Sequence, residues 1–156
     1  MSGTSAVVEQ VVQARLILSA QRSAPLQVVL RYRADDPLAV RMVFPAEYAL
    51  DGPAEDPQDG DGGAAGHEPD PGVEWVFARV LLATGVDRPA GPGDVHIRPA
   101  LDRRTVVELR APEGVALLHF PTQDLRRFLW RSHLAVPAGQ ETRHLDPDRA
   151  LAELLR

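Results

Sequence analysis

Hydrophobic and polar residues alternate along three successive segments near the start of the chain. These segments are residues 7–18, 26–33 and 38–45. Such alternation predicts strands with one buried face, because successive side chains of a strand point to opposite sides of the sheet. Residues 22–26 and 34–37 carry the turn-forming residues between them, and Asp36–Pro37 is expected to begin the second turn.

The alternation returns at residue 73 and then changes to a helical period. Val73, Trp75 and Phe77 alternate as in a strand, and residues 78–84 then have the spacing of a short helix. Gly85 is placed as the residue that follows its last turn, where glycine is favoured. This pattern predicts that Trp75 and Phe77 face inward. It supplies no acid, base or ligand spaced to cooperate with Arg79.

The second half adds more strands and two helices. A turn at 91–94 precedes a strand at 95–98, and residues 105–109 and 115–120 form a hairpin around 112–114. Thr122 is expected to cap a helix whose buried face is Leu125, Phe128 and Leu129, with Arg126, Arg127 and Arg131 pointing elsewhere. Asp146–Pro147 begins a last helix with Leu151, Leu154 and Leu155 on its apolar side. The order predicts one α+β domain over residues 1–156, an antiparallel sheet of about six to seven strands packed with two to three helices.

One segment carries the acidity of the chain. Residues 51–72 hold seven acidic residues and no arginine, with many glycines and prolines and no periodic apolar positions, which predicts a disordered loop inserted in the domain. The chain has 22 acidic residues in all, so fifteen lie outside this segment. All 17 basic residues also lie outside it and are arginine, so the charges of the rest of the chain nearly cancel. This balance lacks the strong basic character of a nucleic-acid-binding domain.

Reactive chemistry is not indicated. There is no cysteine, which excludes disulfides and thiolate metal sites and fits a reducing cytosol. The N-terminus lacks the basic and apolar regions of a signal peptide, and no apolar run reaches the ~20 residues of a membrane-spanning helix. No serine sits in a nucleophile elbow, and the five histidines lack metal-ligand spacing. We therefore expect no catalytic residue, no metal and no cofactor, and interpret the chain as a cytoplasmic, non-enzymatic binding or assembly domain.

The alternative is that a patch of arginines binds a nucleic acid. Such a patch would form if the fold brought together Arg103, Arg104, Arg110, Arg126, Arg127 and Arg131. The near-neutral balance and the scarcity of nearby aromatics, with Trp130 alone on the second helix, favour an ordinary solvated face over a nucleic-acid site.

Five stretches in a fixed order resemble the SsgA-like family of actinobacteria, whose members control sporulation-specific cell division. They are LRYRADDPLAV at 30–40, VEWVFARVLL at 73–82, GVDRPAGPGDVHIRP at 85–99, APEGVALLHFPTQDLRRFLWRS at 111–132 and AVPAGQETRHLD at 135–146. Together they cover nearly the whole chain outside the N-terminal extension and the acidic segment.

The resemblance implies a non-catalytic septation factor that acts at the division septum. In this family the fold is similar to the whirly-type fold of single-stranded nucleic-acid binders and assembles as a homotrimer, and one branch positions the tubulin-like division protein FtsZ. The implied partners are FtsZ, or another SsgA-like protein, and a further copy of the chain. The fold keeps a whirly-like single-stranded nucleic-acid binder as the alternative function.

The chain departs from the family pattern at three places. Leu38 replaces the usual tyrosine, Val80 replaces the usual Asp or Glu, and the insertion at 51–72 is longer. These departures indicate a divergent paralogue. The candidate surface for a partner or for oligomerisation consists of Trp75, Arg79, Val80, Arg126, Arg127 and Trp130.

Overall fold

The computed structural model describes residues 6–44 and 72–144, which form an α+β structure. Its elements in chain order are β1 (Val7–Ser19), β2 (Arg22–Arg33), β3 (Asp36–Phe44), β4 (Val73–Ala78), α1 (Arg79–Gly85), β5 (Val95–Ala100), β6 (Arg104–Ala111), β7 (Gly114–Pro121), α2 (Thr122–Ala135) and the short 3₁₀ helix η3 (Glu141–His144). The predicted last helix and nearly all of the acidic segment lie outside the described residues.

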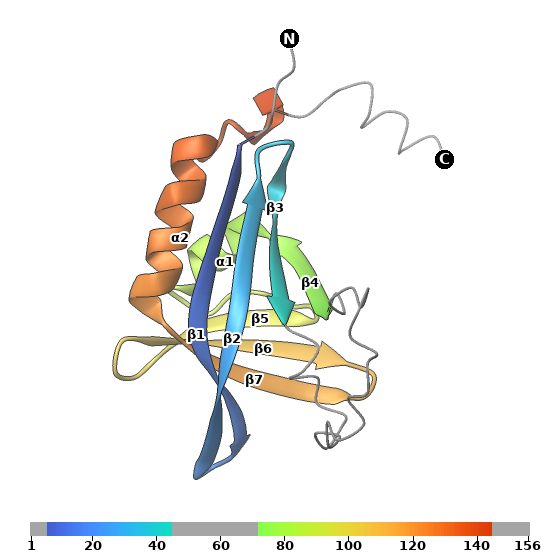
Figure 1. Ribbon diagram of the computed structural model, residues 1–156, viewed down its shortest axis with the longest axis vertical. Helices are drawn as coiled ribbons and strands as arrows, with labels where there is room; N and C mark the ends of the chain where they lie inside the picture. The colour runs from blue at the N-terminus through green and yellow to red at the C-terminus, as the bar shows by residue number, and fades with distance from the viewer. Residues whose placement is uncertain (1–5, 45–71, 145–156) are drawn as a thin grey trace, which may run out of the picture.

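All seven strands belong to one antiparallel sheet in the order β4-β3-β2-β1-β7-β6-β5. The β1–β2 pairing is long, whereas β1 meets β7 through only two residue pairs, Arg15 with His119 and Leu16 with Leu118. The sheet therefore consists of two halves joined at a narrow seam. Figure 1 shows β1–β3 running along the long axis of the molecule and β5–β7 running across it.

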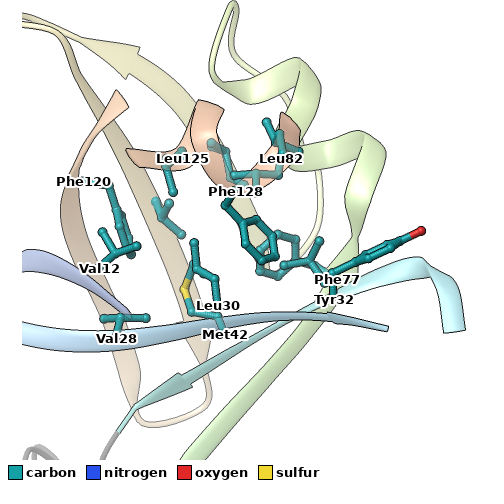
Figure 2. Close-up of a cluster of buried hydrophobic side chains, with 14 of the residues drawn as sticks. Val12, Val28, Leu30, Tyr32, Met42, Phe77, Leu82, Phe120, Leu125 and Phe128 are labelled. Carbon is teal, nitrogen blue, oxygen red and sulfur yellow. The ribbon is translucent and has the colours of Figure 1, made fainter. Parts of the chain in front are cut away.

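The core lies on one face of this curled sheet, where both helices pack. Alternate residues of the strands supply most of it, and α2 covers them with its predicted apolar face of Leu125, Phe128 and Leu129. Figure 2 shows Phe128 and Leu82 of the two helices above the strand residues Leu30 and Met42. Each large side chain buried here contributes roughly 1.5–3 kcal/mol of stabilisation.

The predicted strands are confirmed, but two turns lie elsewhere. The first turn is at residues 20–21, and residues 22–25 continue β2, with Pro25 paired to Arg15. The fixed φ of proline is compatible with an extended strand. The second turn is at Ala34–Asp35, so Asp36–Pro37 opens β3 instead of starting the turn.

The predicted roles of two helix-terminal residues are wrong. The N-cap of α2 is Pro121, and Thr122 is the first helical residue. Its hydroxyl lies 2.7 Å from the hydroxyl of Thr105 instead of accepting a bond from the helix backbone. Gly85 lies inside α1, whose C-cap is Val86. Glycine is required there because a Cβ at this position would collide with the side chain of Ile97 on β5.

This close approach gives a test of the packing between α1 and β5. Helix propensity alone predicts that Gly85→Ala stabilises the protein by up to about 1 kcal/mol. Overpacking against Ile97 costs about 1–3 kcal/mol, so we expect net destabilisation in chemical denaturation. Gly93→Ala is the matched control, because a Cβ at residue 93 meets nothing within 4 Å. An unchanged or higher stability of Gly85→Ala would contradict the steric argument.

Candidate functional site

Arg79, one of the residues predicted to lie on a partner surface, is buried. It opens α1, and its side chain turns toward the C-terminal end of α2, leaving the residue 2% exposed. The guanidinium donates to the carbonyls of Ser132, at 3.1 Å, and Val136, at 2.8 Å. It also pairs with Glu141 at 2.7 Å. Arg79 is therefore not part of the surface, and the expectation that it has no acidic partner is wrong.

The rest of the Arg79 environment completes a polar network inside the core. The ring centroid of Tyr32 lies 4.7 Å from the guanidinium carbon, and the hydroxyl of Tyr32 donates to the carbonyl of Pro37. Figure 2 shows this hydroxyl pointing away from the apolar cluster. The second carboxylate oxygen of Glu141 accepts the backbone N–H of Gly139. The hydrogen bond from Arg79 is the main cause that lowers the pKa of Glu141 below its usual value.

Val80, next to Arg79, points the other way and is 69% exposed. It lines a groove of about 530 Å³ between the edge strand β4, α1 and the turn before β5, together with Val76 and Leu81. Gly91 closes one wall with a φ of +101°, and a Cβ there would collide with the carbonyl of Val95. The groove is therefore mainly apolar and depends on a glycine in its wall.

The outer side of α2 carries three of the other candidate residues. Arg126 pairs with Asp87 at 2.8 Å, and Arg127 is exposed. Trp130 is 62% exposed, and Leu134, one turn further, is 65% exposed. Residues four apart lie on one helix face, so Arg126, Trp130 and Leu134 form a continuous exposed stripe. Large exposed aromatics of this kind are typical anchors of protein–protein interfaces.

Trp75 belongs to the interior more than to a surface. It pairs with Met42 across β3 and β4 and packs, partly buried, against the core. Val76 at the groove and Leu134 on the stripe are exposed apolar residues of these two surfaces that sequence reasoning missed. Alternation and helical spacing mark apolar positions, but they do not tell which of them remain uncovered. Sequence reasoning also missed Glu141 and Ser132 as partners of Arg79. Both lie more than fifty residues from Arg79 along the chain, so no local pattern indicated the contact.

Within residues 6–44 and 72–144, no helix has both the length and the apolar character needed to cross a membrane.

Comparisons with known proteins agree over most of the chain. The family described as Streptomyces sporulation and cell division protein, SsgA, matches residues 26–141. The chain is 39% identical to the sporulation-specific cell division protein SsgB of Streptomyces coelicolor, with 90% of each protein covered. It is 38% identical to SsgB of Thermobifida fusca, with 99% of this chain and 97% of the relative covered.

Two solved structures have the same fold. One comes from work on SsgB mutations that correlate to longitudinal cell division during sporulation of Streptomyces coelicolor, and it has a TM-score of 0.74 at 35% identity. It covers 92% of this chain and 99% of that chain. The other is the SsgA-like sporulation-specific cell division protein from Thermobifida fusca YX-ER1, with a TM-score of 0.73 at 35% identity and 98% of each chain covered.

The Arg79 network predicts a large loss of stability on substitution. Arg79→Met removes the buried cation, leaves the carbonyl of Val136 without its donor and the carboxylate of Glu141 without its partner, while the carbonyl of Ser132 keeps only the N–H of Val136. We expect a loss of about 3–5 kcal/mol in the free energy of unfolding, measured by urea denaturation. Arg126→Met is the control, since it breaks an exposed ion pair worth less than about 1 kcal/mol. Equal losses in the two variants would refute the structural role of Arg79.

The lowered pKa of Glu141 predicts a specific dependence of stability on pH. Because the folded-state pKa of Glu141 lies below its pKa in the unfolded chain, the carboxylate stabilises the protein fully at pH values above that unfolded-state pKa. This contribution is lost as the pH falls from there through the folded pKa. We expect Glu141→Gln to be less stable than the parent at pH 7 and to lose less stability between pH 5 and 3. Glu113→Gln, at the exposed β6–β7 turn, is the comparison for removal of one carboxylate. Identical slopes for Glu141→Gln and the parent would exclude this role.

Proposed function

Because the chain belongs to the SsgA family of sporulation and cell division proteins, we propose that it is a non-enzymatic factor of sporulation-specific cell division that binds proteins of the division machinery. The observation that carries this proposal is the match over 90% of the chain to a protein named for this process, supported by the same fold in two solved relatives. These relatives give no support to the alternative of single-stranded nucleic-acid binding.

Two exposed features support a role in binding proteins. They are the stripe of Arg126, Trp130 and Leu134 on α2 and the apolar groove beside Val80. An interface centre combines a large aromatic anchor with arginine and apolar neighbours, and this is the composition of the stripe. Polar residues around it would form the rim.

The finer parts of the proposal concern partners and place. We infer that the direct partner is FtsZ or another SsgA-like protein, that the chain assembles as a homotrimer, and that it acts in the cytoplasm at the division septum. A specific, stable interface buries about 1,200–2,000 Å² in total. None of the residues that line the groove belongs to α2, so we infer that one surface binds another copy of the chain and the other binds a division protein.

A complementation experiment tests the surface. In the host, a deletion strain is expected to misplace sporulation septa, and the parent gene restores them. We expect Trp130→Ala to abolish the restoration and to weaken capture of division proteins at least tenfold in a pull-down, because truncating an interface anchor costs about 2 kcal/mol or more.

Gln123→Ala, an exposed position at the start of α2, is the matched control and should complement fully. Val80→Asp, which introduces the acid usual in the family, tests the groove in the same assay. If Trp130→Ala and Val80→Asp both complement and assemble like the parent, neither surface binds the partner.

A further inference from the structure

A basic pocket lies at the seam between the two halves of the sheet. It has a volume of about 320 Å³, and its charged or titratable lining residues are Arg15, Asp102, Arg103, Arg104 and His119. Arg15 on β1 faces His119 on β7 at the point where the halves meet. The two consecutive arginines come from the turn between β5 and the start of β6. Three segments thus bring these side chains together.

The three arginines of the basic pocket are not neutralised within the part of the chain that the structure describes. Other arginines of the same sheet are paired: Arg98 and Arg110 both bind Glu108, at 3.2 and 2.7 Å. No ion pair or side-chain hydrogen bond joins Arg15, Arg103 or Arg104 to a described residue, and all three are exposed. Asp102 is the one acidic residue in the lining, so the pocket keeps an excess of positive charge.

The backbone at the pocket is strained. Asp102 and Arg103 have φ values of 60° and 58°, a left-handed conformation that glycine adopts freely and that residues with a Cβ adopt only at an energetic cost. The carbonyl of Arg103 accepts the N–H of Thr122 at 3.0 Å, which ties the turn to the start of α2. The chain therefore holds two charged side chains in a conformation that a glycine would relieve. Strain of this kind concentrates at functional sites.

The titration of His119 agrees with the positive field. Partial burial lowers its pKa, and the positive charges of Arg104 and Arg98 lower it further. The lowered pKa favours the neutral imidazole, as expected beside positively charged guanidinium groups.

We propose that the basic pocket binds an acidic peptide segment, with two or more Asp or Glu side chains close together, on a partner protein. Guanidinium groups bind carboxylates through two parallel hydrogen bonds, and several arginines around one depression are able to engage adjacent carboxylates together. This proposal specifies the chemistry of one partner, and it rests on the proposed function of the chain as a protein that binds partners.

Two observations favour an acidic peptide over a nucleic acid. None of the residues that line the basic pocket is aromatic, so bases would find no ring to stack on. Outside residues 51–72 the chain is nearly neutral, so it lacks the strong basic character with which a domain binds the backbone of a nucleic acid.

The test is fluorescence anisotropy with the purified full chain and a labelled Glu-Glu-Asp-Glu peptide, against the Gln-Gln-Asn-Gln peptide as probe control. We expect saturable binding of the acidic peptide that weakens as salt rises, and at least fivefold weaker binding for Arg15→Ala and for Arg104→Ala. Arg88→Ala is the matched control, an exposed arginine outside the pocket, and should bind like the parent. Absence of binding, or an equal loss in Arg88→Ala, overturns the proposal. Displacement by single-stranded DNA or inorganic phosphate at lower concentration than by unlabelled acidic peptide also overturns it.

Arg103→Gly separates binding from a purely structural role. Glycine relieves the strained φ, so we expect a higher Tm together with at least fivefold weaker peptide binding. Unchanged peptide affinity in this variant contradicts the assignment of Arg103 to the site.

Peptide binding is measured on the purified protein, whereas septum placement is measured in cells. A pocket that fails to bind, in a protein that still restores septation, therefore removes only this inference and leaves the proposed function intact.

Discussion

The buried guanidinium of Arg79 connects parts of the molecule that the sheet leaves separate. It donates to carbonyls at the end of α2, pairs with Glu141 of η3 and lies over the ring of Tyr32 on β2. An unpaired charge in this position would cost several kcal/mol, so the cation is tolerated only while all its partners are in place. The position of the chain after α2 is therefore coupled to the packing of α1.

This coupling determines which side chains remain at the surface. Once α1 and the end of α2 are held on the same face of the sheet, Phe128 and Leu82 are covered. Trp130 and Val80, which neighbour buried residues in the sequence, are left exposed. The stripe on α2 and the apolar groove are thus consequences of how a buried polar group fixes two helices. A partner that binds either surface contacts an element whose position the network specifies.

The seam between the two halves of the sheet is a second constraint with functional meaning. Only two residue pairs join β1 to β7, and the basic pocket lies beside them with a strained turn tied to the start of α2. The pocket is basic and the groove is mainly apolar, so the two surfaces would suit partners of different chemistry.

The sequence by itself determined where the strands and helices of the described residues lie, but not the residues at their turns and ends. Alternation located the strands, helical spacing identified Leu125, Phe128 and Leu129 as the buried face of α2, and ordered motifs indicated the family. These patterns are readable because the two-residue period of a strand and the 3.6-residue period of a helix are properties of the local backbone. Only the tertiary structure decided that Arg79 is buried against Glu141, that Gly85 serves contact with Ile97, and that Arg15 lies beside Arg103. Such contacts depend on how the two halves of the sheet curl and where the helices cover them, and no short stretch of sequence records that arrangement.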